Sequence, residues 1–183
     1  MQMRNIVNKS LLLLALSLLF SVPLEAQQTM KNDNDLQKRV RELEDRAALK
    51  ELVDTFSILA DRKDVKTQVQ LFTANATTET YRKDVLVSKL NGRKEMEDAF
   101  GAFLKNFDTV YHFNGQQTVT LDGDRASGVS YCTVRLIGVE GGKRMKTTIG
   151  VVYQDEYVRE GGRWLIAKRR SNFDWQDRRE LGQ

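Results

Sequence analysis

The feature that most limits how this chain can fold is a series of four long strand-like segments in its second half. Short turns that contain glycine separate them, at Asp122-Gly123-Asp124, Gly141-Gly142 and Gly161-Gly162. Extended segments joined by such turns are typical of β-hairpins. The sequence therefore predicts an antiparallel meander with strands at residues 110–121, 125–139, 146–159 and 163–175.

Helical patterns dominate the part of the chain that precedes this meander. Apolar residues recur every three or four positions over residues 36–60, which predicts one long amphipathic helix with a break near Glu44-Asp45. Asp64 is expected to cap a second, shorter helix. Residues 94–107 show a third amphipathic pattern.

Two further extended segments lie between the second and third helices. The threonine-rich residues 74–81 predict a strand, and residues 84–90 predict either a strand or an extended loop. Helices followed by a run of strands define an α+β domain, with the helices on one face of the sheet.

The N-terminal 26 residues have the pattern of a secretory signal peptide. Two basic residues precede an apolar run at 11–22, and small residues before Gln27 offer a cleavage site after Ala26. The run is shorter than the roughly 20 residues that span a membrane, although an uncleaved anchor is the alternative. We expect an exported protein, periplasmic or secreted, with no membrane attachment after cleavage.

The remaining chain then divides into a polar segment, one domain and a tail. Residues 27–42 are expected to be a polar linker with a helix extension, disordered over 27–34. Residues 43–175 form one domain of ordinary size. The polar residues 176–183 are expected to fray.

Charge and cysteine content exclude several classes of function. Loss of a leader with two basic residues and one acidic residue lowers the formal net charge from +4 to +3, and Lys168-Arg169-Arg170 is too small a basic cluster to predict nucleic-acid binding. Cys132 is the only cysteine, so it cannot form an intrachain disulfide and is expected to be buried and inert. One histidine and one cysteine do not make a zinc cluster, and we expect no metal.

The single histidine, His112, lies in the first strand of the meander. Side chains alternate along a strand, so His112, Asn114, Gln116 and Thr118 are expected on one face. Tyr111, Phe113, Val119 and Leu121 would then lie on the other face. A face with an imidazole, two amides and a hydroxyl is either exposed to solvent or the wall of a polar-lined pocket.

Several short motifs resemble the SnoaL-like branch of the nuclear transport factor 2-like superfamily, over residues 43–175. The motifs are Leu43-Glu44-Asp45-Arg46-Ala47-Ala48, Leu59-Ala60-Asp61-Arg62-Lys63-Asp64, Leu71-Phe72, Leu121-Asp122-Gly123-Asp124, and Gly161-Gly162-Arg163-Trp164 with Lys168-Arg169-Arg170. The resemblance implies a strongly curved antiparallel sheet that forms a cone with three helices and encloses a pocket. It also implies a homodimer that pairs through the outer face of the sheet, where Tyr157 is a candidate contact.

The enzymes of this branch imply a site that needs no cofactor. They include scytalone dehydratase, a dehydrochlorinase of chlorinated cyclohexanes, bile-acid dehydratase and polyketide cyclases, and several use a histidine base oriented by an aspartate from the end of the first helix. By resemblance, His112 is the base, Asp61 its orienting aspartate and Arg169 a cation in the pocket. A carboxylate fixes the imidazole tautomer, and a guanidinium stabilises developing negative charge. Asp61 could instead be a solvated charge or a helix cap, and Arg170 could face inward in place of Arg169.

The chain also departs from these enzymes. Phe56 stands where they often place a tyrosine or a lysine, and the second histidine of scytalone dehydratase is absent, so the pocket is expected to be more apolar. Candidates to line it, which could equally be core residues, are Phe56, Phe72, Tyr81, Phe103, Phe107, Tyr131, Tyr153 and Trp175. Two hypotheses remain: a cofactor-independent lyase or isomerase acting on a small hydrophobic substrate, and a non-catalytic module that binds a ligand or mediates dimerisation.

Overall fold

A computed structural model describes residues 24–182 of the chain. Most of the predicted signal peptide, residues 1–23, therefore lies outside the described residues. The chain divides into two units, Met1–Arg41 and Glu42–Gln183. In the first unit the described residues belong to helix α1, Leu24–Asp61, so the prediction of disorder over 27–34 is wrong. Among the described residues, none of the helices combines the length and the apolar character needed to cross a membrane.

Within the second unit, α1 runs without a break through Glu44 and Asp45 to its end at Asp61. One face of this part is buried, with Leu49, Leu52, Val53, Phe56, Leu59 and Ala60 at helical spacing. After Lys63, which has a positive φ of 57°, the chain enters the short helix α2, Val65–Gln68. The Asp64 side chain accepts a hydrogen bond from the backbone N–H of Thr67, which confirms the predicted cap.

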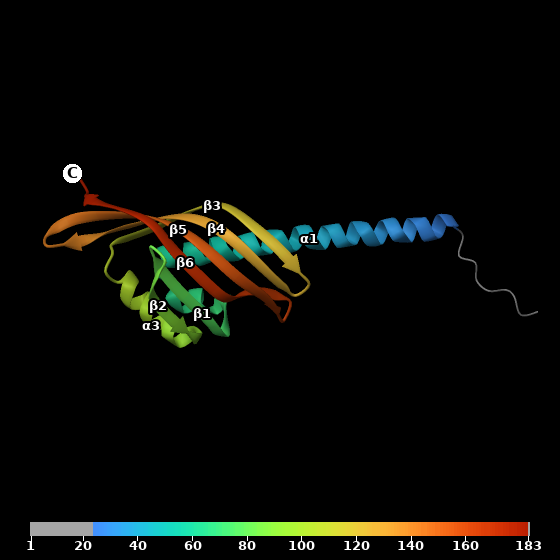
Figure 1. The fold of residues 1–183 in the computed structure, drawn as a ribbon, viewed down its shortest axis with the longest axis horizontal. Helices are drawn as coiled ribbons and strands as arrows, with labels where there is room; N and C mark the ends of the chain where they lie inside the picture. Colours follow the sequence, from blue (N-terminus) through green and yellow to red (C-terminus); the bar gives the residue numbers. More distant parts are fainter. Residues whose placement is uncertain (1–23, 183) are drawn as a thin grey trace, which may run out of the picture. The chain divides into compact units, whose positions relative to one another are not determined.

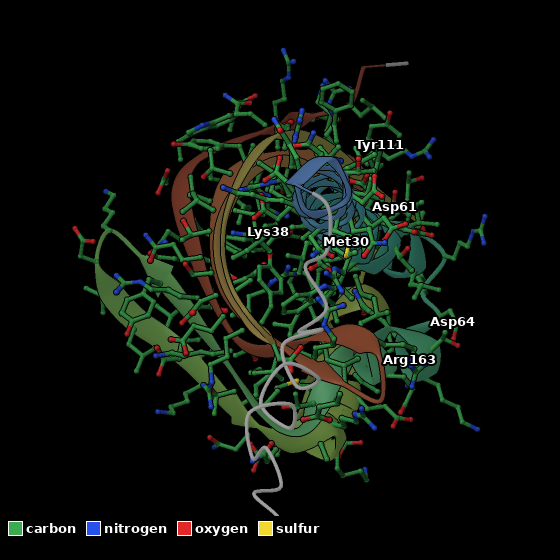
Figure 2. All side chains as sticks on the ribbon, turned by 90° about the vertical axis from the view of Figure 1, so that its right-hand side faces the viewer. Met30, Lys38, Asp61, Asp64, Tyr111 and Arg163 are labelled. Carbon is green, nitrogen blue, oxygen red and sulfur yellow. The ribbon has the colours of Figure 1, made fainter. Side chains whose placement is uncertain are left out.

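Six strands form one mixed sheet that is curled but not closed, and helices lie against it (Figures 1 and 2). The order across the sheet is β2-β1-β6-β5-β4-β3. The strands are β1 Phe72–Arg82, β2 Val85–Asn91, β3 Thr109–Asp122, β4 Arg125–Glu140, β5 Lys143–Glu160 and β6 Arg163–Glu180. The predicted α+β class and cone-forming fold are confirmed.

One pair of strands departs from the expected antiparallel sheet. β1, which follows the short helix η1, Val69–Leu71, runs parallel to β6. Between them in the chain lie β2, the helix α3, Gly92–Leu104, and the other three meander strands, which start at the far edge of the sheet with β3. α3 packs against β1 and β2 (Figure 1). The strand β6 also continues to Glu180, which pairs with Met145, so the expectation that residues 176–183 fray is wrong over most of that segment.

A β-bulge in β3 corrects the expected alternation around the histidine. The pairing of β3 with β4 shifts register between Asn114 and Gln117, so one extra residue is accommodated and the faces exchange. His112 and Asn114 therefore share the inner face with Gln117, Val119 and Leu121, while Gln116 and Thr118 are exposed. The prediction that all four polar residues share one face is wrong beyond the bulge.

The core lies between the concave face of the sheet and the helices of the second unit. Phe56 of α1, Phe72 of β1 and Phe100 of α3 make edge-to-face or tilted ring contacts at its centre. Tyr157 is only 1% exposed and belongs to this core, so it is not available as the dimer contact that the sequence suggested. Tyr111, whose side chain projects outward in Figure 2, is exposed.

Candidate functional site

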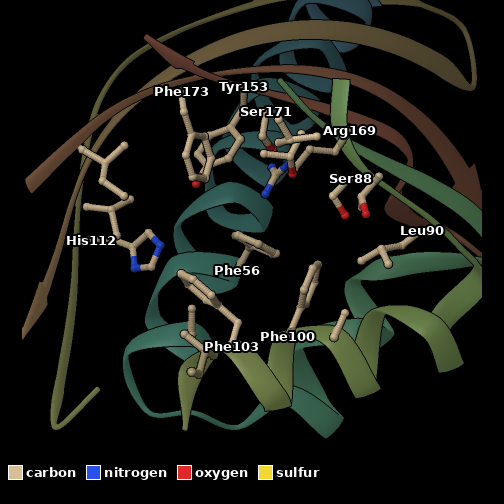
Figure 3. Close-up of a pocket in the computed structure, with 18 of the residues that line it drawn as sticks. Phe56, Ser88, Leu90, Phe100, Phe103, His112, Tyr153, Arg169, Ser171 and Phe173 are labelled. Atoms are coloured by element: carbon tan, nitrogen blue, oxygen red, sulfur yellow. The ribbon is translucent and has the colours of Figure 1, made fainter. Parts of the chain in front are cut away.

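The site is a cavity of about 310 Å³ between α1, α3 and the inner face of the sheet (Figure 3). Most of its wall is apolar. α1 contributes Phe56 and Ala60, and α3 contributes Ala99, Phe100, Phe103 and Leu104. Four strands provide the rest of the apolar wall: Val87 and Leu90 of β2, Val134 and Leu136 of β4, Ile149 and Tyr153 of β5, and Phe173 of β6.

His112 lies in this wall and contacts Asp61. Its Nδ1 is 2.7 Å from Oδ1 of Asp61, and its backbone N–H donates to Oδ2 of the same carboxylate over 3.2 Å. The carboxylate thus holds both the strand and the ring, so Nδ1 carries a proton as donor and Nε2 is left for the cavity. The side chain of His112 is 8% exposed and that of Asp61 is 25% exposed, so the pair is partly shielded from water.

Polar contacts between α1 and β3 fix the position of this pair. The Asn114 amide donates to Asp54 Oδ1 over 3.0 Å, and its oxygen accepts from the Ser57 hydroxyl over 3.1 Å. The Gln117 amide donates to the backbone oxygen of Leu49 over 3.3 Å. These bonds lie along the same helix that ends in Asp61. They hold β3 against α1, and His112 is thereby held beside the helix end.

Arg169 lies in the cavity wall on β6, and Asp155 of β5 binds it through two hydrogen bonds of 2.8 and 2.7 Å. Its guanidinium stacks between the rings of Phe56 and Tyr153, with its carbon 4.2 and 4.4 Å from the ring centroids. Burial by itself disfavours the charged form, but the charge and hydrogen bonds of Asp155, together with Tyr153 and Tyr157, raise the pKa of Arg169. Arg169 is therefore a permanent cation.

Arg169 rather than Arg170 faces the cavity. Arg170 lies on the opposite face of β6, where its guanidinium covers the ring of Tyr81 at 3.8 Å from the centroid. The alternative left open by the sequence is thus decided by the register of β6 against β5, which places Arg169 opposite Asp155.

Two buried polar atoms in the cavity wall have no hydrogen-bond partner among the described residues. They are Nη1 of Arg169 and Oε1 of Gln68, whose amide nitrogen is bound to the backbone oxygen of Phe56. Figure 3 shows the Arg169 guanidinium directed into the cavity. Buried polar groups are normally satisfied, so these two atoms are suited to binding polar groups of a ligand.

The Asp155 carboxylate also accepts a hydrogen bond from a buried tyrosine. The Tyr157 hydroxyl donates to Asp155 Oδ2 over 2.9 Å, and burial, followed by the Asp155 charge, raises the pKa of Tyr157. Gly128 makes room for this ring, since a Cβ at that position would lie 3.0 Å from it. Tyr157, Asp155 and Arg169 thus form a buried chain that ends at the cavity.

Of the aromatic residues predicted to line the cavity, Phe56, Phe103 and Tyr153 do so. Phe72 is fully buried behind Phe56 and Phe100 and belongs to the core, and Phe107 packs against Phe103 outside the cavity wall. Tyr81, Tyr131 and Trp175 are also not among the cavity-lining residues. Tyr81 lies under Arg170 on the outer face, and Tyr131 and Trp175 are exposed. The prediction is wrong for these five, because each one's place depends on strand register or helix packing.

Sequence reasoning missed the polar part of the wall. Thr78, Thr80 and Arg82 of β1, Ser88 of β2 and Ser171 of β6 line the cavity. The threonines alternate in the sequence, and such alternation could have indicated one face of a strand. The parallel pairing of β1 with β6, which brings them to the cavity, had no signal in the sequence.

The cavity offers few ligands for a metal. Among the described residues that line it, His112 is the only histidine, cysteine, aspartate or glutamate. Nowhere in residues 24–182 do three such side chains gather as a metal site. Cys132 is buried nearby on β4, and burial raises the pKa of its thiol to about 12. The expectation that no cofactor is needed stays a prediction.

The chain belongs to the SnoaL-like domain family, whose model matches residues 41–170. An uncharacterized protein of Mycobacterium bovis is 27% identical over 131 residues, covering 71% of this chain and 86% of the relative.

Two solved structures share the fold. The hexachlorocyclohexane dehydrochlorinase LinA-type3 of Novosphingobium barchaimii superposes with a TM-score of 0.65 at 18% identity, covering 79% of this chain and 94% of the other. A protein of Novosphingobium aromaticivorans, provisionally named a scytalone dehydratase, superposes with a TM-score of 0.64 at 16% identity, covering 74% and 88%. These similarities show the nuclear transport factor 2-like fold.

Proposed function

We propose that this protein is a cofactor-independent lyase or isomerase that removes a proton from a carbon atom of a small hydrophobic substrate. The observation that carries the proposal is the 2.7 Å contact of His112 Nδ1 with Asp61 in the wall of a largely apolar cavity. With Nδ1–H directed to the carboxylate, Nε2 has the free electron pair of a base on the cavity side.

In the proposed reaction, Nε2 of His112 takes the proton as the carbon–hydrogen bond breaks. The electron pair moves either onto an adjacent carbonyl oxygen, which gives an enolate, or into a new carbon–carbon double bond as a hydroxide or halide departs with its own bonding pair. Asp61 stabilises the imidazolium that forms. Nη1 of Arg169, which has no hydrogen-bond partner within residues 24–182, would donate to the enolate oxygen or to the departing group.

The fold neighbours support this reaction class. One is named a dehydrochlorinase and another provisionally a dehydratase, and both names describe eliminations. Because both identities are below 25%, these names support a class of reaction and not a particular substrate.

The test is proton abstraction by the purified protein. Cyclic ketones in D₂O are followed by proton NMR for exchange at the carbon beside the carbonyl, and chlorinated cyclohexanes are followed by chloride release. We expect His112→Ala and Asp61→Asn to lower the rate of any turnover by roughly 10²–10⁴-fold. Asp64→Asn is the matched control, because Asp64 lies three residues away, caps α2 and does not contact the histidine.

A rate that is unchanged in His112→Ala would contradict the proposal. The second hypothesis, a ligand-binding module, is favoured by Phe56, whose ring covers one face of the Arg169 guanidinium. Compounds that bind the wild-type cavity but undergo neither exchange nor elimination would favour that second hypothesis.

Export is proposed from the basic and apolar pattern of residues 1–26. Mass spectrometry of the protein recovered from the native host would find a chain that begins at Gln27. An intact N-terminus at Met1 would favour the anchor alternative.

The homodimer also stays a proposal, with a second copy on the outer face of the sheet. Aromatic side chains that would support it there, Tyr111, Phe113 and Tyr131, are about half or more exposed. Light scattering is expected to show that the wild type is a dimer and that Phe113→Glu is a monomer. A monomeric wild type would contradict the proposal.

A further inference from the structure

We propose that the natural ligand of the cavity is an amphipathic carboxylate, whose apolar ring lies against the phenylalanines and whose carboxylate binds at Arg82 and a row of hydroxyls. This inference deepens the proposed function, on which it rests, by assigning a substrate class to the same site. Its basis is the polar wall formed by β2, β1 and β6.

The hydroxyl row follows directly from the strand register. Ser88 pairs with Thr80 across β2 and β1, Thr80 pairs with Ser171 across β1 and β6, and Ser171 pairs with Tyr153 across β6 and β5. Directly paired residues in a sheet point to the same face. All four line the cavity, so four hydroxyl-bearing side chains lie side by side across four neighbouring strands.

Within residues 24–182, no protein group uses these hydroxyls in a hydrogen bond. The side chains of Thr80, Ser88, Ser171 and Tyr153 make no hydrogen bond within the described part of the chain, and neither does that of Thr78, which lies one step along β1 opposite Arg169. Thr78 and Ser171 are largely buried and lie in the cavity wall. A row of free donors and acceptors in an otherwise apolar cavity provides polar groups at fixed positions, which is how small-molecule sites orient their ligands.

The charges of the lining residues favour an anionic ligand group near Arg82 and the hydroxyl row. None of the described lining residues is an aspartate or a glutamate. Arg169 is already paired with Asp155, whereas Arg82 has no carboxylate within ion-pair distance in residues 24–182 and only lies over the Phe173 ring, 5.6 Å from its centroid. Among the described lining residues, Arg82 is thus the guanidinium whose charge is not already paired, and its side chain is exposed.

A carboxylate fits these groups better than a phosphate dianion does. One unpaired guanidinium balances one negative charge, and its planar fork matches the two oxygens of a carboxylate. The neighbouring hydroxyls of Thr80 and Ser88 can donate to the remaining lone pairs. A phosphate dianion would leave one charge unbalanced in a wall that is mostly apolar.

The polar row and the histidine lie on different sides of the cavity. β2 and β3 are the two edges of the sheet, and its curl brings both edges to one cavity. Figure 3 shows His112 on one side, Ser88 on the other, and Phe56, Phe100 and Phe103 between them. A ring compound held by its carboxylate at Arg82 would therefore lie across the phenylalanines, with its far side toward His112.

The experiment compares two probes of similar shape, 2-naphthoate and the neutral ketone 2-acetylnaphthalene. Calorimetric titration of the full chain measures both dissociation constants. We expect naphthoate to bind about 10-fold more tightly than the ketone. Arg82→Met should weaken naphthoate binding about 10-fold and leave ketone binding unchanged, while Arg82→Lys should retain part of the difference. Thr80→Val, which keeps the side-chain shape, should weaken naphthoate binding about 3-fold.

The control is Arg135→Met, which removes the same charge from an exposed residue between Val134 and Leu136 on the opposite face of β4. Equal affinity of the wild type for the two probes, or an equal effect of Arg135→Met and Arg82→Met, would overturn the proposal. Tighter binding of 2-naphthyl phosphate than of naphthoate would also overturn it.

Naphthoate binding is measured in His112→Ala as well, because a base is not needed to hold a carboxylate. Retained preference for naphthoate in that variant supports the anion site whether or not turnover is found. Turnover that depends on His112 without any preference for the anion would support the proposed reaction and reject this substrate class.

Discussion

Two side chains of the cavity wall, His112 and Arg169, are each paired with a carboxylate at the same contact distance but in very different surroundings. Asp61 and His112 meet at 2.7 Å with side chains 25% and 8% exposed. Asp155 and Arg169 also meet at 2.7 Å, but their side chains are 1% and 2% exposed and the guanidinium is enclosed by two rings. The contact alone therefore does not decide what a pair can do.

The difference lies in whether a proton can be exchanged. A guanidinium is charged throughout the physiological range, and Asp155 raises the pKa of Arg169 further. An imidazole can take up a proton on one ring nitrogen while the other nitrogen stays bound to a carboxylate, and Asp61 is partly exposed. The first pair is suited to proton transfer, and the second to a fixed positive field.

The largest effect is expected when the buried pair is broken. Asp155→Asn leaves the Arg169 charge buried without its counter-ion, so the free energy of unfolding should fall by about 3–5 kcal/mol. Urea unfolding measures this change. Asp174→Asn, at an exposed site on the same strand as Arg169, should change it by less than about 0.5 kcal/mol.

The double variant Asp155→Leu/Arg169→Met sharpens the same comparison, because it removes both charges and leaves apolar bulk. It should recover most of the lost stability. A loss of less than about 1 kcal/mol in Asp155→Asn would mean that water reaches Arg169 and that the two pairs are alike.

A smaller effect is expected at Cys132, whose thiol is influenced by both pairs. Burial raises its pKa to about 12, and the charges of Arg169 and Asp61 act on it in opposite directions. The raised pKa stabilises the fold below pH 9, the ordinary value for this thiol, and that stabilisation is lost as the pH rises from 9 toward 12. Between pH 8 and pH 10 the wild type should lose about 1.4 kcal/mol more than Cys132→Val.

Chemical denaturation at the two pH values measures the Cys132 effect. The comparison with Cys132→Val also controls for the tyrosines, because both proteins contain the same tyrosines. Parallel losses in the two proteins would show that the thiol is accessible to water.

The smallest change in stability is expected at the pair of Asp61 and His112. Asp61→Asn removes a partly exposed carboxylate and should cost about 1 kcal/mol or less. Its main effect should be on the ring: nitrogen NMR should find the proton of neutral His112 on Nδ1 in the wild type and a mixture of tautomers in the variant. The single histidine gives one set of ring signals. Asp64→Asn should leave them unchanged, and a wild-type proton on Nε2 would contradict the arrangement.

The fold and part of the site could be predicted from the sequence because the patterns that mark them are local. Helical and strand periodicities are local, so the C-terminal end of the long helix, the α3 region and the four meander strands could be predicted within about five residues, whereas the helix begins about 12 residues earlier than its apolar pattern indicated. Asp61 and His112 were selected because family motifs mark the end of the first helix and the first meander strand. Arg169 was separated from Arg170 only by strand register, which no local pattern reveals.

The errors at the site concern relations between segments. The bulge at residues 115–116 exchanges the faces of β3, and Gln117 takes the inward position that the alternation gave to Gln116. The parallel pairing of β1 with β6 creates the hydroxyl row, but its partners are about 90 residues apart in the chain. Trp175 was expected in the pocket, yet it lies over Gly150, where a Cβ would be 2.1 Å from its ring nitrogen.

The place of β6 in the sheet has a consequence for how the protein is made. β6 follows every other strand in the sequence, yet it lies inside the sheet between β1 and β5. During synthesis, β1, β2 and α3 leave the ribosome early and wait for a partner strand that is translated about 90 residues later. Until then two strand edges stay unpaired, and contacts this distant in sequence form slowly. We therefore expect the nascent chain to depend on chaperones until its final strand has emerged.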